Sequence, residues 1–413
     1  MNKSSPLIAM NLKLNAIAPQ RLLAPILTLG RHLSLISLLV GVGTLANFAV
    51  MALPALAALE MRVAIEQDVS QVTIGSSTNA VLRDGSGQVL AEIPAMGALV
   101  AESNGGRVTV NRWTAGQVWV EPEADGFVYI GDKWYRGRTL VLPTSGGITA
   151  VNYVDLEEYL YSVVGAEMPT SWPLEALKAQ AVSARSYALY QRQTSGNTVF
   201  DVGDTTSWQV YSGLEKEATS TQQAVRETAG QVLVHEGRII EAVFHSASGG
   251  YTENVEDVWT SYRPYLRAVQ DFDQNAPVYQ WTETFSADQL RARITGVGNI
   301  LSLQPERRTN QGRIITMRVV GDAGTRTLSG NELRQALDLR STLFEVTPSL
   351  PNVASTGNTV PVPTSFQVQG RGFGHGLGLS QWGAREMASQ GQNYQQIVSH
   401  YYTGANLAVI QVE

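Results

Sequence analysis

The sequence predicts an α+β protein in which a smaller β-rich N-terminal unit lies beside a mixed body of helices and strands. Three observations support this class. Residues 62–145 alternate apolar and polar positions between Asp-Gly and Gly-Gly turns, which is typical of short antiparallel strands. Residues 174–193 repeat apolar side chains every three or four positions, which predicts a helix. Residues 275–348 mix strand patterns with a helical one near 330–337.

The first 59 residues contain basic but no acidic residues, and no charge occurs from Leu33 to Leu59. This pattern predicts a secretory signal with a long basic leader, and the Ala-Leu-Ala sequence at 55–57 supplies a cleavage site that would start the mature chain near Ala58. An uncleaved membrane anchor is the alternative, since about 20 apolar residues span a bilayer. We therefore assign 1–57 to a signal peptide or anchor and expect export to the periplasm or cell envelope.

The composition of the remaining chain excludes some classes of function. The 413 residues are 44% hydrophobic and 16% charged, which is typical of a folded protein. Without the four basic residues of the leader, 26 basic residues remain against 36 acidic ones, a formal charge of −10. Such a body is not expected to bind nucleic acid. The chain has no cysteine, which excludes disulfides, thiolate metal ligands and thiol nucleophiles.

Two units follow the leader. Residues 58–147 form the β-rich unit, for which we expect an accessory or structural role. Residues 148–413 form the mixed catalytic body, and within it the Pro-, Ser-, Thr- and Asn-rich residues 351–365 predict a surface loop.

The first elements of the mixed body follow from capping and periodicity. Asp155 and Glu158 form an Asp-x-x-Glu capping pattern that opens a helix ending near Val164. Pro173 suits the first position of the helix over 174–193, on which Lys178 and Arg185 lie two turns apart, beside the apolar stripe.

The later elements alternate helix and strand. We expect a helix near 221–228, a hairpin from 231 to 244 that places His245 at its end, and a strand over 314–320. A strand at 366–369, a Gly-rich loop at 370–378 and helices near 380–390 and 394–402 complete the chain.

Glu167 is the candidate general acid. It lies in an Ala-Glu-Met-Pro sequence, too far upstream of Pro173 to cap the following helix. Met168, Pro169 and Trp172 would give it apolar surroundings, which raise the pKa of a carboxyl toward the range useful for proton donation.

Two histidines lie in polar, glycine-containing segments. His245 is followed by hydroxyl residues and two glycines, a setting suited to hydrogen bonding a sugar or orienting a carboxylate; the alternative is a satisfied core histidine. His375 lies in the loop over 370–378, whose glycines permit either close approach to a bulky ligand or merely a compact turn. The loop is not a dinucleotide fingerprint, because no second βα unit follows it. Ser380 is not in a nucleophile elbow.

Several longer stretches resemble one known family. They are DLEEYL at 155–160 leading to EMP at 167–169, WP at 172–173 with AQAVSARSY at 179–187, FH at 244–245 with SGG at 248–250 and TE at 252–253, DVW at 257–259 with PYL at 264–266, LSG at 328–330 with LRST at 339–342, and the segment from 370 to 384. Together they resemble the SpoIID family, named for stage II sporulation protein D and including the LytB amidase-enhancer proteins.

The resemblance implies an envelope enzyme that acts on peptidoglycan as a lytic transglycosylase, on glycan strands stripped of stem peptides. Glu167 would protonate the glycosidic oxygen and then accept the proton of the C6 hydroxyl of N-acetylmuramic acid (MurNAc), which closes on C1 to give a 1,6-anhydro end. A single carboxylate suffices for this reaction, whereas ordinary glycosidases need two.

The resemblance also implies a set of substrate-binding residues. Lys178, Arg185, His245 and His375 would line the cleft, Ser248, Ser380 and Gln381 lie in matching segments, and Tyr402 is either a further cleft residue or a core aromatic. Some relatives hold zinc with a histidine and cysteines near the segment of His245; since this chain has no cysteine, we predict no metal and no cofactor.

Three other functions stay open. The protein could bind glycan strands without cleaving them and stimulate a separate cell-wall amidase. It could be a hydrolysing muramidase, which would need Glu253 or Asp257 opposite Glu167. A purely structural envelope protein is the third. The expected partners are therefore peptidoglycan glycan strands and a cell-wall amidase, with membrane contact only through an uncleaved leader.

Overall fold

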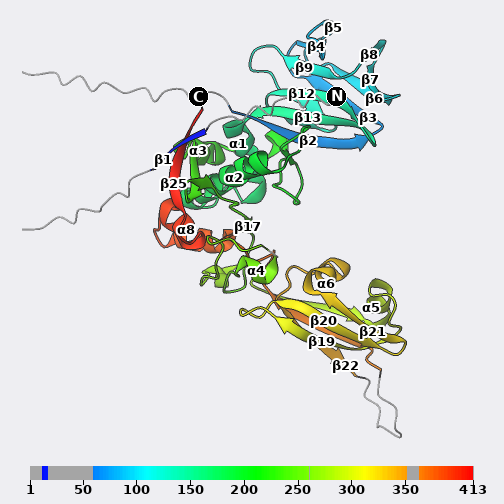
Figure 1. The fold of residues 1–413 in the computed structure, drawn as a ribbon, viewed down its shortest axis with the longest axis vertical. Coiled ribbons are helices and arrows are strands. Elements are labelled where there is room, and N and C mark those ends of the chain that lie inside the picture. Colours follow the sequence, from blue (N-terminus) through cyan, green and yellow to red (C-terminus); the bar gives the residue numbers. More distant parts are fainter. Residues whose placement is uncertain (1–11, 17–58, 260, 351–361, 413) are drawn as a thin grey trace, which may run out of the picture.

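The computed structural model describes residues 12–16, 59–259, 261–350 and 362–412. Figure 1 shows three parts along the long axis of the molecule: a β-rich unit, a helical body and a second lobe. The mixture of helices and strands confirms the predicted α+β class. Most of the leader and residues 351–361 of the expected surface loop lie outside the described residues. No helix in the described part is long and apolar enough to cross a membrane.

The β-rich unit contains two antiparallel sheets, in keeping with the alternation of its sequence. One has the order β11-β10-β3-β6-β7-β8 and the other β14-β2-β13-β12-β9-β4-β5, in which β14 pairs with β2 in parallel. The bounds are β2 (Glu60–Val69), β3 (Gln71–Ser76), β4 (Ala80–Asp84), β5 (Val89–Ile93), β6 (Ala98–Asn104), β7 (Arg107–Val110), β8 (Trp113–Ala115), β9 (Val118–Pro122), β10 (Val128–Ile130), β11 (Lys133–Tyr135), β12 (Arg138–Thr144), β13 (Gly147–Asp155) and β14 (Val202–Gly203). Because β13 pairs with both β2 and β12, the sheet continues past residue 147, where the sequence suggested a boundary.

The helical body is built around one long buried helix. Helix α2 (Leu174–Thr194) packs against α1 (Leu156–Glu167), α3 (Thr219–Glu227), α7 (Gln381–Ser389) and α8 (Tyr394–Tyr401). The predicted cap of α1 is present, since the Asp155 side chain accepts from the backbone N–H groups of Glu157 and Glu158. Pro173 is the N-cap of α2, one position before the place expected for it.

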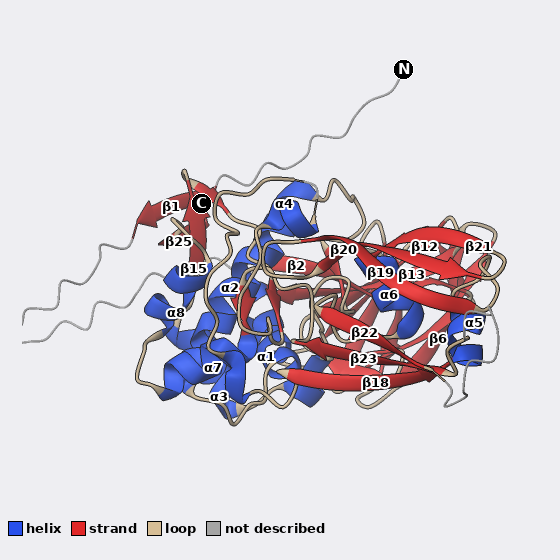
Figure 2. Ribbon diagram, turned by 90° about the horizontal axis from the view of Figure 1, so that it is seen from below, coloured by secondary structure: helices blue, strands red, loops and turns tan. Residues whose placement is uncertain are grey.

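A four-stranded sheet closes one side of the helical body (Figure 2). Its order is β1 (Leu12–Ala16), β25 (Asn406–Val412), β15 (Gln231–His235) and β16 (Arg238–Ile239). Strand β1, which lies inside the predicted leader, pairs antiparallel with β25. The expected hairpin is shorter than predicted, since its second strand ends at Ile239, and His245 belongs instead to β17 (Phe244–His245), which pairs in parallel with β24 (Leu379–Ser380).

The second lobe has a hydrophobic core of its own. Two three-stranded sheets, β18-β23-β22 and β19-β20-β21, and two short helices surround buried residues that include Trp281, Phe285, Met317 and Phe366. The bounds are β18 (Gln280–Ser286), α5 (Ala287–Arg293), β19 (Ile300–Arg308), β20 (Ile314–Gly321), β21 (Gly324–Ser329), α6 (Gly330–Leu337), β22 (Phe344–Ser349) and β23 (Ser365–Arg371). Residues 148–413, which the sequence assigned to one mixed body, therefore contain two separate cores. The short helix α4 (Val255–Val258) lies near the junction of the second lobe with the helical body (Figure 1).

Candidate active site

Glu167 is the last residue of α1, and the sequence explains why the helix ends there. Met168 precedes Pro169, and a residue before proline is disfavoured in the helical conformation. Met168 accordingly has extended backbone angles, with φ −128° and ψ 144°, and its N–H closes the helix by donating to the carbonyl of Val164. Of the three apolar residues expected around Glu167, Met168 is buried, Trp172 is half-buried and Pro169 is exposed.

The carboxyl of Glu167 is half-buried and held by two donors. Its Oε1 accepts from the backbone N–H of Val210 at 2.9 Å, and its Oε2 accepts from the side-chain amide of Gln381 at 3.4 Å. Among the residues that the structure describes, no cation lies within 4.0 Å of it. Burial raises the pKa of Glu167, and the two hydrogen bonds lower it by less. A carboxyl that keeps its proton more readily than usual is suited to general acid catalysis.

Glu167 opens into a cavity of about 710 Å³, here called the main cavity. Segments far apart in the sequence meet around it. Its lining is Glu167, Tyr187, Thr206, Ser207, Trp208, Glu241, Val243, Phe244, His245, Ser246, Trp259, Arg334, Gln335, Phe373, Gly374, His375 and Gln381. The mixture of aromatic rings with hydrogen-bonding groups suits a sugar, whose faces are apolar and whose edges carry hydroxyls.

His245 is a buried wall residue with one free acceptor. Its Nδ1 lies 3.1 Å from the carbonyl of Leu377, so Nδ1 carries the proton and Nε2 holds a lone pair. That Nε2 atom is buried and has no partner in the described structure. Burial, with a smaller contribution from the charge of Arg313, lowers the pKa of His245 to about 3. The ring therefore stays neutral and presents an acceptor.

His375 has the opposite tautomer. The backbone N–H of Leu377 donates to its Nδ1 at 3.0 Å, and its Nε2 donates to the carbonyl of Phe244 at 3.0 Å. Its ring lies 5.3 Å from that of His245 and 5.4 Å from that of Trp259, measured between centroids. His375 thus lines the cavity with its ring, while both of its nitrogens are satisfied by the backbone.

The other predicted contact residues divide into those at the cavity and those away from it. Gln381 lines the cavity and donates to Glu167. Ser380 is buried beside it and caps α7, its Oγ accepting from the N–H of Gly383 at 3.3 Å. Ser248 is buried and donates to Asp271, and Tyr402 is a buried aromatic whose hydroxyl donates to the carbonyl of Val243 at 2.9 Å. Tyr402 therefore takes the core role that the sequence left as its alternative.

The two cations of α2 do not line the cavity. Arg185 is 0% exposed, and its guanidinium makes two hydrogen bonds to the carboxylate of Glu157, at 2.8 and 2.5 Å, and one to the carbonyl of Gln231 at 3.0 Å. Lys178 pairs with Glu175 at 2.8 Å and with Glu227 at 2.5 Å. Both charges are used within the fold, so the prediction that they contact substrate does not fit their placement.

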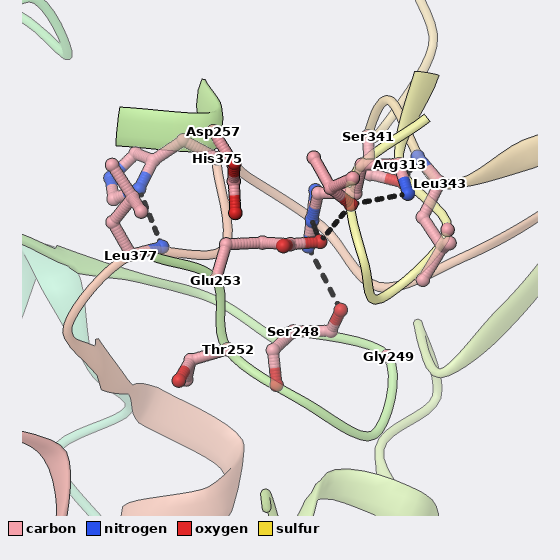
Figure 3. Close-up of polar contacts among 12 residues, drawn as sticks. Ser248, Gly249, Thr252, Glu253, Asp257, Arg313, Ser341, Leu343, His375 and Leu377 are labelled. Carbon is pink, nitrogen blue, oxygen red and sulfur yellow. Dashed lines mark hydrogen bonds and ion pairs between the residues drawn. The ribbon is translucent and has the colours of Figure 1, made fainter. Parts of the chain in front are cut away.

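The two acids proposed as partners of Glu167 also lie outside the main cavity. Glu253 is buried beside Arg313 (Figure 3), and its Oε1 accepts from Thr309 at 2.8 Å. Asp257 lines a smaller neighbouring cavity. The second carboxylate of the main cavity is Glu241, whose Oε2 lies 3.4 Å from Nε of Arg263.

Sequence reasoning missed Glu241, Trp208, Trp259 and Arg334 as cavity residues. Trp259 lies inside a matching stretch, so the family pattern could have indicated it. The other three carry no local signal, since each is a single residue in a separate segment of the chain. Within the described ranges, no group of three or more His, Asp or Glu residues is arranged to hold a metal ion.

Comparison with known proteins identifies the family of the chain. The family model of SpoIID, described as stage II sporulation protein, matches residues 144–235, and a domain of unknown function, DUF8618, matches residues 259–378, which include the second lobe. Stage II sporulation protein D of Bacillus amyloliquefaciens is 37% identical over 281 residues, covering 63% of this chain and 76% of that protein.

Two further relatives extend the comparison. An uncharacterised protein of Brachyspira hyodysenteriae is 35% identical over 285 residues, covering 68% of this chain and 74% of its own. The amidase enhancer of Bacillus subtilis is 32% identical over 293 residues, covering 60% of this chain and 40% of its own. With relatives of this identity matched over about three quarters of their length, the chain belongs to the SpoIID family, as its sequence motifs predicted.

Proposed function

We propose that this protein is an exported peptidoglycan lytic transglycosylase, which cleaves the MurNAc–GlcNAc bond (GlcNAc being N-acetylglucosamine) of glycan strands without stem peptides during cell-wall remodelling. The observation that carries the proposal is Glu167: a half-buried carboxyl with a raised pKa and two hydrogen-bond donors, opening into a cavity of sugar-binding character. Membership in a family that includes sporulation and amidase-enhancer proteins supports a role at the cell wall.

The chemistry follows from a single carboxyl used twice. Glu167 donates its proton to the bridging oxygen as the bond between C1 of MurNAc and that oxygen breaks. The carboxylate left behind accepts hydrogen bonds from Val210 and Gln381. It then accepts the proton of the C6 hydroxyl as that oxygen bonds to C1. The products are a 1,6-anhydro-MurNAc end and a GlcNAc with a free 4-hydroxyl, and no water is consumed.

The neutral imidazole of His245 supports this assignment as a positioning group. Its unpartnered Nε2 can accept a hydrogen bond from a sugar hydroxyl or amide N–H. Because His245 is buried and its pKa is lowered to about 3, it does not compete with Glu167 as a proton donor.

Digestion of stem-peptide-free glycan strands, followed by mass spectrometry of the ends, tests the proposal. Wild-type protein should produce anhydro-muramyl ends, and Glu167→Gln should reduce the rate by about 10²–10⁴-fold, the usual contribution of a general acid. Glu241→Gln is the matched control at the other cavity carboxylate and should keep the product. Reducing ends that require Glu241 would instead identify a hydrolase with two carboxylates.

A second candidate function is the non-catalytic one, favoured by the likeness to an amidase enhancer. In that case both wild type and Glu167→Gln would bind strands without cleaving them, and each would stimulate a cell-wall amidase equally.

A further inference from the structure

The main cavity continues into the second lobe. A second cavity of about 240 Å³, here called the side cavity, shares four lining residues with it: Trp259, Arg334, Gly374 and His375. The remaining lining of the side cavity includes the polar residues Asp257, Thr309, Ser329, Asn331 and Thr342. A ligand in the main cavity can therefore extend a substituent past the shared wall.

Arg334 is the cation of that shared wall. It is half-buried on α6, and its Nε donates to the carbonyls of Leu339 at 3.2 Å and Arg340 at 3.3 Å, which fixes one edge of the guanidinium. In the described structure its terminal nitrogens, Nη1 and Nη2, have no acceptor, and no carboxylate lies within 4.0 Å. By contrast, the buried Arg185 and Arg313 each face a glutamate.

The other charges of the two cavities, except that of Asp257, have identified partners. Glu241 faces Arg263, Arg313 faces Glu253, and Glu167 is held by two neutral donors. Asp257 of the side cavity lies beyond 4.0 Å from every described cation. Arg334 is thus a partly desolvated cation on the wall of both cavities: backbone carbonyls hold it, the charge of Asp338 attracts it from a distance, and no described carboxylate lies within 4.0 Å. A planar guanidinium with two free donors recognises a carboxylate in a bidentate manner.

We propose that Arg334 is a specificity-determining residue that binds the free lactyl carboxylate of a muramic acid unit. The inference rests on the proposed function in that it takes a muramyl glycan as the ligand. In a strand without stem peptides the lactyl group ends in a carboxylate, whereas in a peptide-bearing strand the same carbon is a neutral amide. Arg334 therefore selects stripped strands, because the amide leaves its charge without a partner.

Binding in an inactive background tests this without relying on turnover. Glu167→Gln protein is titrated calorimetrically with a muramyl tetrasaccharide in three forms: with free lactyl carboxylates, with those groups converted to methylamides, and with stem peptides attached. We expect the carboxylate form to bind about 10- to 100-fold more tightly than the methylamide, the range for one charged hydrogen-bonded contact.

Adding Arg334→Gln should abolish that preference by weakening the carboxylate form to the level of the methylamide, and Arg334→Lys should restore part of it. Arg318→Gln, at an exposed position of β20 in the same lobe, is the matched control and should change nothing. The proposal is overturned if the preference survives Arg334→Gln, if the parent shows none, or if the peptide-bearing form binds best, which would assign the cation to a peptide carboxylate. Preference without cleavage by the wild type would keep this inference and remove the lytic activity.

Discussion

Replacing Glu253 by glutamine tests whether burial or attraction to Arg313 has the larger effect on this carboxyl, near the junction of the helical body with the second lobe. Glu253 and Arg313 both have side chains that are 1% exposed, and Oε1 of the acid lies 3.5 Å from Nε of the arginine. The Arg313 guanidinium also donates to the carbonyls of Gly374 at 3.0 Å and Ser248 at 2.9 Å. Attraction to Arg313 favours the charged carboxylate, while burial of an acid whose Oε2 has no partner in the described structure disfavours it.

Burial is the larger effect on Glu253. It raises the pKa from 4.5 to about 7, against the opposing effects of the hydrogen bond from Thr309 and the charge of Arg313. A raised folded-state pKa means that stability is fully present below the unfolded pKa and is lost as pH rises through the folded one. A difference of about 2.5 pKa units corresponds to about 3 kcal/mol lost between pH 4.5 and 7.

The expected result is therefore a pH-dependent gap between Glu253→Gln and wild type. Near pH 4.5 the two should have similar free energies of unfolding, because both carry a neutral side chain. At pH 8 the variant should be more stable by about 3 kcal/mol. Urea unfolding followed by tryptophan fluorescence at four pH values between 4.5 and 8 measures the gap.

Glu283→Gln, at an exposed position of the second lobe, controls for the change in net charge. Its stability should differ little from that of the wild type between pH 4.5 and 8. A Glu253→Gln variant that is less stable than wild type by about 3–5 kcal/mol at pH 8, the usual cost of breaking a buried ion pair, would refute the reasoning. It would show that attraction to Arg313 outweighs burial.

Three further predictions concern the fold and the acid. Arg185→Met should cost about 3–5 kcal/mol of stability by leaving Glu157 unpaired, with KM unchanged, as urea unfolding and kinetics would show. Gln381→Ala removes a donor that lowers the pKa of Glu167, so the alkaline limb of the kcat/KM profile should move to higher pH. Gly378→Ala should lower Tm, since φ is +66° and the added Cβ would collide with the carbonyl of Val243.

Most of the longer helices and the cap at Asp155 could be predicted because their signals are local, whereas the short helices α4 and α5 were not expected. The Asp155 cap, the stretch over 174–193 and the helix at 330–337 each depend on residues within a few positions of one another. The strand partners could not be predicted. Parallel pairing of β14 with β2 joins residues far apart in the chain, and no local pattern encodes it.

The candidate site could also be predicted only where its residues lie in segments with a local pattern. Glu167, His245, His375 and Gln381 lie in segments with a recognisable pattern, and all four line the main cavity. Arg185 illustrates the limit: its spacing from Lys178 indicates a common face of α2, but only the fold reveals that Glu157 of α1 meets it there. A charged residue on a predicted helix can be a ligand contact or a buried ion pair, and the partner decides which.

The glycines of the loop at 370–378 explain how the helical body and the second lobe come to share the main cavity. A Cβ on Gly376 would meet the guanidinium of Arg313, and one on Gly374 would meet the side chain of His245, so the close approach that these glycines permit is made by the protein itself. Arg313, which immediately precedes β20, ties the second lobe to the loop that carries His375 by donating to the carbonyl of Gly374. Because Arg334 follows on the same lobe and Glu167 lies on the helical body, this buried contact fixes the position of the cation relative to the acid. The second lobe is therefore part of the wall of the main cavity. If the proposed function holds, its docking determines which substituent of a glycan fits beside Glu167.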